Sequence, residues 1–186
     1  MSWTTPTDIF AQLQKNELFQ KWQKLNPQNY LTHLFCPLSA DLNPKAEWEV
    51  GFFNPKTEKI TVFAPLKNDF EIKPEDEVFQ KEKVKLEELE LNKIKVHLEK
   101  ALEIWKEQAA KLFPKEKTGD GFLILQRFEK KDLWNFTFIT TSLKFVNLKI
   151  NAEKGGIESH QILDLIDREK QKYEKITFLI NRTSQF

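Results

Sequence analysis

The chain has 186 residues, enough for one domain or two small ones, and its 40% hydrophobic content predicts a folded protein with a buried core. Its 29 basic and 28 acidic side chains give a net charge of +1, which argues against nucleic acid or an anionic membrane as a partner. Cys36 is the only cysteine, and the first residues lack the basic and apolar pattern of an export signal. We therefore expect a cytoplasmic protein without disulfides.

The first third of the chain predicts one helix followed by strands. Pro6 begins a helical apolar pattern that continues to residue 25, where Asn26 and Pro27 end it. A short apolar run over 30–36 indicates a strand. Residues 48–63 alternate around turn-forming residues and predict a β-hairpin.

The middle of the chain changes character. Residues 67–91 are rich in charge and predict a solvated connector. Leu89 to Val96 indicate a short strand, and a helix that begins near Leu86 is the alternative. Apolar positions at helical spacing then predict a second helix over 98–113.

The last third predicts more antiparallel strands. Apolar or alternating runs occupy 122–125, 134–139 and 143–150, and the turn after them contains Gly155 and Gly156. The remaining predicted elements are a returning strand over 157–160, a helix from Ser159 or His160, and a closing strand over 176–180.

The two halves of the sequence match each other in outline. Each contains a helix with a central tryptophan, Trp22 or Trp105, and then a strand that opens with a tryptophan, Trp48 or Trp134. The pattern predicts an α+β fold of two helix-plus-antiparallel-strand repeats, PepSY-like or cystatin-like, with the helices packed on antiparallel sheet. The predicted boundaries are a first repeat at 1–66, a connector at 67–91, a second repeat at 92–160 and a C-terminal helix, strand or tail at 161–186, unless all of them form one compact domain.

The second half also resembles a known family. The helix over 98–113, the hairpin around Trp134 and the segment Leu148–Ile157 resemble the helix, antiparallel strands and glycine-containing final turn of PepSY domains. This chain has Asn151 where the family usually has aspartate. The resemblance implies a binding or inhibitory module without catalytic residues. PepSY domains are typically found outside the cytoplasm, and this chain departs from the family there, because its first residues lack the pattern of an export signal.

Candidate catalytic or metal-binding residues are few. His33 and Cys36 lie three residues apart, which places them on opposite faces of a strand, and a buried cysteine is the favoured interpretation. Ser159, His160 and Asp164 are close only along the sequence. His97 is isolated at an element boundary. We therefore predict no catalytic, metal or cofactor-binding residues.

Two charged or glycine-containing patterns have simpler explanations than a site. Glu99, Glu103 and Glu107 recur at helical spacing among lysines, which indicates a solvated helix face. Gly119 and Gly121 precede a strand, whereas a phosphate-binding loop precedes a helix.

The aromatic residues of the strands suggest one candidate surface. Two helices give limited cover, so part of the aromatic set is a candidate ligand or partner surface, and a fully buried core is the favoured alternative. The five residues are Trp48, Phe52, Trp134, Phe136 and Phe138.

Together these observations predict a non-enzymatic binding or scaffold protein that interacts with a protein or peptide, with strand addition at a sheet edge as its mode. The alternatives are a small-molecule-binding protein or enzyme with a pocket between helix and sheet, and a protein similar to secretion chaperones.

Overall fold

The computed structural model describes residues 3–67, 69–73, 76–77 and 86–164. The helices are α1 (Pro6–Lys15), α2 (Glu17–Leu25) and α3 (Leu98–Leu112), with a short 3₁₀ helix, η1 (Leu91–Lys93). The strands are β1 (Tyr30–Leu38), β2 (Glu49–Asn54), β3 (Lys59–Pro65), β4 (Phe70–Ile72), β5 (Asp76–Glu77), β6 (Thr118–Phe128), β7 (Lys131–Thr140), β8 (Lys144–Asn151) and β9 (Ile157–Asp164).

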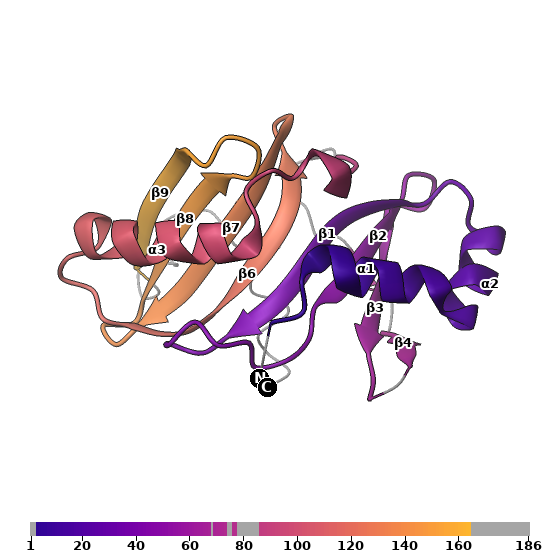
Figure 1. The fold of residues 1–186 in the computed structure, drawn as a ribbon, viewed down its shortest axis with the longest axis horizontal. Coiled ribbons are helices and arrows are strands. Elements are labelled where there is room, and N and C mark those ends of the chain that lie inside the picture. The colour runs from indigo at the N-terminus through magenta and orange to yellow at the C-terminus, as the bar shows by residue number, and fades with distance from the viewer. Residues whose placement is uncertain (1–2, 68, 74–75, 78–85, 165–186) are drawn as a thin grey trace.

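All the described strands belong to one antiparallel sheet. Its order is β4-β3-β2-β1-β6-β7-β8-β9, and β5 pairs with the same strand as β4, namely β3. Figure 1 shows β1 and β6 side by side in the middle of the molecule, with β9 at the far edge. The central pair is in register from His33 opposite Gln126 to Leu38 opposite Gly121.

The predicted fold class of two helix-plus-strand repeats is wrong, because the dominant feature is this single continuous sheet. Pairing of β1 with β6 joins the N-terminal and C-terminal strands through their backbones, so neither set forms a sheet of its own. Where the two central strands pair, residues 34–37 of β1 and 122–125 of β6 are apolar and buried, which suits the middle of a sheet that is covered on both faces. Hydrophobic periodicity identifies such strands but carries no information about which distant strand pairs with which.

The predicted first helix over 6–25 is two helices that meet at Asn16. The backbone of Asn16 is extended, with φ −75° and ψ 132°, and its side-chain oxygen accepts a hydrogen bond from the Phe19 amide at 3.2 Å. Asparagine is a favoured N-cap because its side chain satisfies an amide that the first turn of the helix leaves unpaired. Asn16 therefore ends α1 and caps α2. The predicted second helix agrees with α3 to within one residue.

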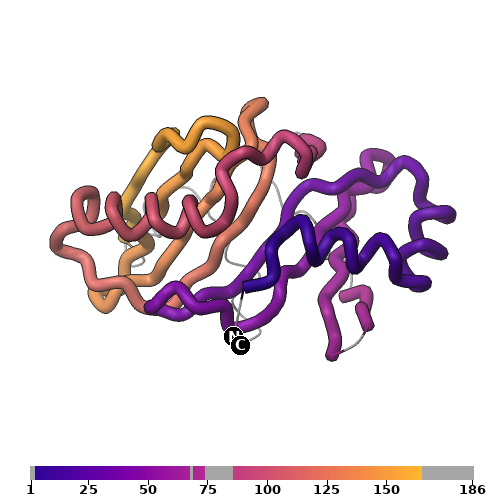
Figure 2. The backbone as a smooth tube through the Cα atoms, in the orientation of Figure 1, coloured from indigo at the N-terminus to yellow at the C-terminus, as the bar shows by residue number. Residues whose placement is uncertain are grey.

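All three helices lie on one face of the sheet (Figures 1 and 2), and aromatic side chains fill the space between the layers. Under α2, the ring centroids of Trp22 and Phe63 are 5.0 Å apart. Under α3, Trp105 lies 5.2 Å from Phe136 and 4.7 Å from Phe138. Buried aromatic contacts of this kind are worth about 0.5–1.5 kcal/mol each beyond the area they bury.

Three predictions for the connections have different outcomes. Residues 89–96 contain η1 and form neither a strand nor a helix from Leu86; Leu89 is nevertheless buried, and its amide donates to the Leu31 carbonyl at 2.8 Å. The returning strand at 157–160 is confirmed and extends to Asp164 as β9, so the predicted start of a helix at Ser159 or His160 is wrong. The rest of the tail at 161–186, beyond Asp164, lies outside the described residues.

One glycine of the central sheet, Gly121 in β6, leaves no space for a side chain. A Cβ atom on Gly121 would lie 2.2 Å from the Thr137 carbonyl oxygen and 2.8 Å from the Phe138 Cα, both of which are backbone atoms of β7. Because backbone atoms of a paired strand cannot move aside cheaply, we expect Gly121→Ala to lower the free energy of unfolding by about 1–3 kcal/mol. Urea denaturation monitored by tryptophan fluorescence measures this loss.

Gly156→Ala is the matched control, since a Cβ atom there meets nothing within 4 Å. We expect it to change the free energy of unfolding by less than about 0.5 kcal/mol. Equal stability losses in the two variants would contradict the close packing of β6 against β7.

Candidate functional site

The five aromatic residues that were predicted as a candidate surface lie in the core. Trp48 and Trp134 are each 1% exposed, Phe52 is 4% exposed, and Phe136 and Phe138 are fully buried. They point to the helix-covered face and belong to one continuous hydrophobic cluster. These side chains therefore leave almost no exposed area for a partner.

Two of these residues instead attach the segments before the helices to the sheet. The indole nitrogen of Trp48 donates to the Thr4 carbonyl at 2.8 Å, and that of Trp134 donates to the Val96 carbonyl at 2.8 Å. Thr4 and Val96 lie just before α1 and α3 respectively. Each tryptophan therefore combines a large apolar contact with a satisfied polar group.

His33 and Cys36 lie on opposite faces of β1. The His33 ring lies over Gly51 of β2, where an added Cβ would approach it to 2.1 Å, and its Nδ1 is 2.9 Å from the Thr32 hydroxyl. Cys36 belongs to the helix-side core. Burial, with further contributions from Glu47 and Glu49, raises the pKa of the Cys36 thiol to about 12. This environment disfavours the thiolate that a nucleophile or metal ligand needs.

The other candidate residues are dispersed in the same way. Ser159 and His160 are neighbours on β9 and lie opposite Lys149 and Leu148 of β8, so they face opposite sides of the sheet. His97 occupies the N-cap position of α3 without a side-chain capping bond. Among the described residues, no three His, Cys, Asp or Glu side chains are grouped so as to hold a metal ion.

One acidic residue of α3, Glu103, forms a surface ion pair. Glu103 accepts a hydrogen bond from Lys100 at 3.0 Å, and this bond raises the pKa of the Lys100 ammonium. Both side chains are more than half exposed. This geometry agrees with the solvated helix face that was the favoured interpretation of Glu99, Glu103 and Glu107.

A partly buried ion-pair cluster lies at one end of β6 and β7. Arg127 donates to both carboxylate oxygens of Asp132 at 3.1 Å, and its Nε lies 3.6 Å from the Glu87 carboxylate. Burial raises the pKa of Asp132, and the Arg127 guanidinium opposes that rise. The Glu87 carboxylate also accepts from the Lys130 amide at 2.8 Å. The cluster therefore attaches the segment around Glu87 to the sheet.

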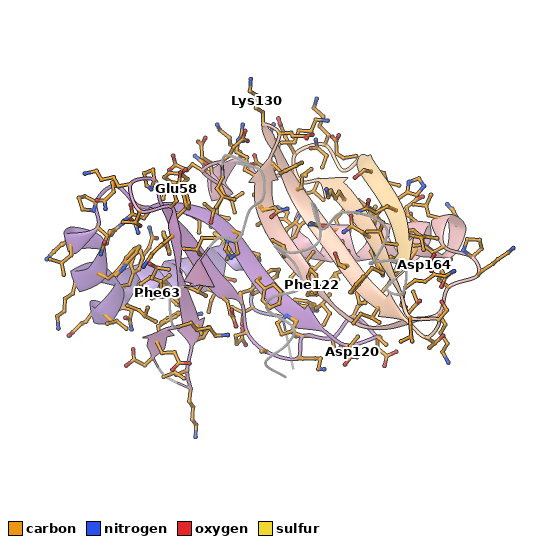
Figure 3. The ribbon with its side chains drawn as sticks, turned by 180° about the vertical axis from the view of Figure 1, so that it is seen from behind. Glu58, Phe63, Asp120, Phe122, Lys130 and Asp164 are labelled. Atoms are coloured by element: carbon orange, nitrogen blue, oxygen red, sulfur yellow. The ribbon has the colours of Figure 1, made fainter. Side chains whose placement is uncertain are left out.

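The face of the sheet opposite the helices carries a buried polar group of residues from β7 and β8. The Asn147 amide donates to Asn135 Oδ1 at 2.6 Å and to Thr137 Oγ1 at 2.8 Å, while its own Oδ1 is buried without a hydrogen-bond partner. Phe35, Phe122 and Ile124 form a small apolar cluster beside it; Figure 3 shows this face, with Phe122 labelled. This polar group could have been predicted from the sequence, because Asn147 alternates with core residues along β8.

The two edges of the sheet differ in what they offer to a partner. One edge consists of the short strands β4 and β5, of three and two residues, beside a strand that ends in Pro65. The other edge is β9, which has eight residues and no proline. Among the described residues β9 pairs only with β8, and its Ile157 and Ile162 side chains are 39% and 44% exposed.

Several contacts hold β9 in an extended conformation. Glu158 forms an ion pair with Lys131 and accepts a hydrogen bond from Asn151 at 2.7 Å. The hydrogen bond from Lys131 lowers the pKa of Glu158. From Ser159 to Asp164 the register with β8 is continuous. The edge is therefore preorganised, which reduces the conformational entropy that a bound strand must overcome.

Comparison with known proteins assigns no family to the chain. No protein-family model matches it, and no curated protein matches it. A candidate lipoprotein from Clostridium difficile 630 of known crystal structure superposes with a TM-score of 0.44 and 15% sequence identity, over 78% of this chain and 90% of that one. None of the described helices could span a membrane. The PepSY resemblance stays a prediction, and neither that resemblance nor this structural likeness assigns a function.

The environment of Cys36 makes a direct prediction about thiol reactivity. With a pKa of about 12, the native protein holds on the order of a thousandfold less thiolate at pH 8 than the unfolded chain. We expect Ellman's reagent to react at least that much more slowly with the native protein than with protein in 6 M guanidinium chloride. Stoichiometric labelling of the native protein within minutes would contradict the buried thiol.

The ion-pair cluster predicts a pH-dependent loss of stability. Arg127→Met leaves the buried Asp132 carboxylate without its main partner. We expect the free energy of unfolding at pH 7 to fall by roughly 2–3 kcal/mol. This is less than the cost of breaking a fully buried pair, because Arg127 is partly exposed. A carboxyl group whose pKa is raised by folding stabilises the fold when protonated, and that stabilisation is lost as pH rises through the folded pKa. The loss should therefore shrink toward pH 4.

The double variant Arg127→Met/Asp132→Asn is the control, because it removes the charge together with its partner. Its free energy of unfolding at pH 7 should exceed that of the single Arg127→Met variant. A single variant whose deficit stays constant from pH 7 to pH 4 would refute the assignment of the loss to the Asp132 charge.

Proposed function

We propose that this protein is a non-enzymatic binding module that accepts an extended strand of a protein partner along the outer edge of β9. The observation that carries the proposal is the contrast between the two edges: β4 and β5 are short, whereas β9 is long, held in place and exposed. Natural proteins usually protect an edge by shortness, proline or charge, because unpaired backbone groups recruit further strands.

The chemistry of strand addition fits the residues of β9. Backbone hydrogen bonds supply affinity in this mode, and alternate side chains supply specificity. Ile162 lies opposite Val146 and faces the helix-covered side, while Leu163 lies opposite Phe145 and faces the other side. A partner strand would therefore find an apolar residue on each face, next to polar ones.

The proposal is tested by selecting extended peptides from a random library and mapping their binding by NMR. Binding should shift the β9 amide signals and slow their hydrogen exchange. Ile162→Lys should weaken the selected peptides at least about tenfold, because it puts a charge in the apolar contact. Leu25→Lys is the matched control, since Leu25 is 81% exposed on α2, and it should leave binding unchanged.

Selected peptides whose shifts and protection fall outside β9, or which bind equally well to the Ile162→Lys variant, would contradict the proposal. A library that yields no binder to the monomeric protein would count against it in the same way.

A further inference from the structure

The side chains of β9 are complementary to those of a second, antiparallel copy of β9. In the regular part of the strand, His160, Ile162 and Asp164 lie opposite Leu148, Val146 and Lys144 of β8, so they share one face of the sheet. Gln161 and Leu163 alternate with them and occupy the other face. Residues that face each other across an antiparallel pair point to the same side of the sheet. A two-fold axis must therefore place one residue opposite its own copy.

We infer that a second copy of this chain binds along β9, with Ile162 on the two-fold axis. The inference rests on the proposed strand-accepting function of this edge and names its partner. In this register Ile162 faces Ile162 of the second copy, and His160 faces Asp164 on each side of it. The imidazole N–H can donate to the carboxylate whether or not the ring is protonated. On this face an apolar centre is thus flanked by a favourable polar pair and its symmetry copy, while on the other face Gln161 lies opposite Leu163.

The neighbouring registers are poorer. An axis at Gln161 places Glu158 opposite Asp164, and like charges directly opposite each other destabilise a strand pair. An axis at Leu163 places Ile162 opposite the Asp164 carboxylate. An axis at His160 places Glu158 opposite Ile162. The charges and apolar residues of β9 therefore favour the Ile162 register over these three.

Within residues 3–164, as far as the structure describes them, β8 is the only strand that pairs with β9. The 6.2 Å contact between the rings of Phe113 and His160 holds His160 on the face where it would meet Asp164 of the second copy. Figure 3 labels Asp164 at the end of β9, on the outer edge of the sheet. Two sheets joined here would form one continuous antiparallel sheet across the dimer. Because the paired strand is short, the interface is at the small end of the range for stable complexes, and we expect a dissociation constant on the order of 10–100 μM.

Sedimentation velocity of the full chain between about 5 and 500 μM tests the inference in that predicted affinity range. The average mass should rise from monomer to dimer with concentration. Ile162→Lys places two like charges on the axis and should keep the protein monomeric at every concentration. Leu25→Lys, an equal change at a remote exposed leucine, should dimerise like the parent protein. Circular dichroism melts establish that both variants are folded.

The register has its own test. His160→Asp places two carboxylates opposite each other at both ends of the pair and should weaken dimerisation at least tenfold. The double variant His160→Asp/Asp164→His restores an unlike pair in the reverse orientation and should recover most of the affinity. A double variant as weak as the single one would overturn the register.

The results separate this inference from the proposed function. A parent protein that stays monomeric but binds selected peptides through β9 overturns the dimer and leaves the strand-accepting edge intact. A dimer that survives Ile162→Lys, or that Leu25→Lys abolishes, has its interface elsewhere and also overturns the inference. A monomer for which the peptide library gives no β9 binder overturns both.

Discussion

The pairing of β1 with β6 is the contact on which the rest of the structure depends, because it joins strands separated by some eighty residues of chain. Leu34 lies opposite Leu125 and Cys36 opposite Leu123, and all four side chains enter the helix-side core. The backbone N–H and C=O groups that the two strands turn toward each other are paired in this ladder, so they need no water at the junction. The helices of both halves consequently pack on one surface and share a continuous hydrophobic cluster.

The second constraint is the need of each buried tryptophan for a hydrogen-bond acceptor. Trp48 and Trp134 lie 6.2 Å apart by ring centroid near the centre of the molecule, and each donates to a carbonyl just before a helix. An indole left unsatisfied at such a depth would cost about 1–3 kcal/mol. The entry points of α1 and α3 are therefore fixed relative to the central strands, and through them the positions of Trp105 and its aromatic neighbours.

Local elements could be predicted from the sequence where a local physical cause defines them. The hairpin at 48–63 is defined by its turn, and α3 by its apolar spacing. The break at Asn16 had a sequence signal that was missed, because asparagine is a typical N-cap and the interval from Leu13 to Leu18 does not fit one continuous helical face. Strand partners could not be predicted, since the choice of β6 for β1 depends on long-range register. The candidate aromatic surface failed for a related reason: Phe52, Phe136 and Phe138 alternate like any half-buried strand, and only the packed helices show which face is covered.

A single open sheet has two edges, and this chain treats them differently. At the β4 edge, strands of two and three residues limit any further pairing. At the β9 edge, Lys131 and Asn151 hold Glu158, and the next six residues continue in register with β8. Stability alone does not require this order, because an edge strand with exposed isoleucines contributes little buried area and carries a risk of aggregation. An edge that is both exposed and held in position suits a strand that binds there, and this contrast supports our proposal of a binding edge at β9 rather than a surface in the aromatic core.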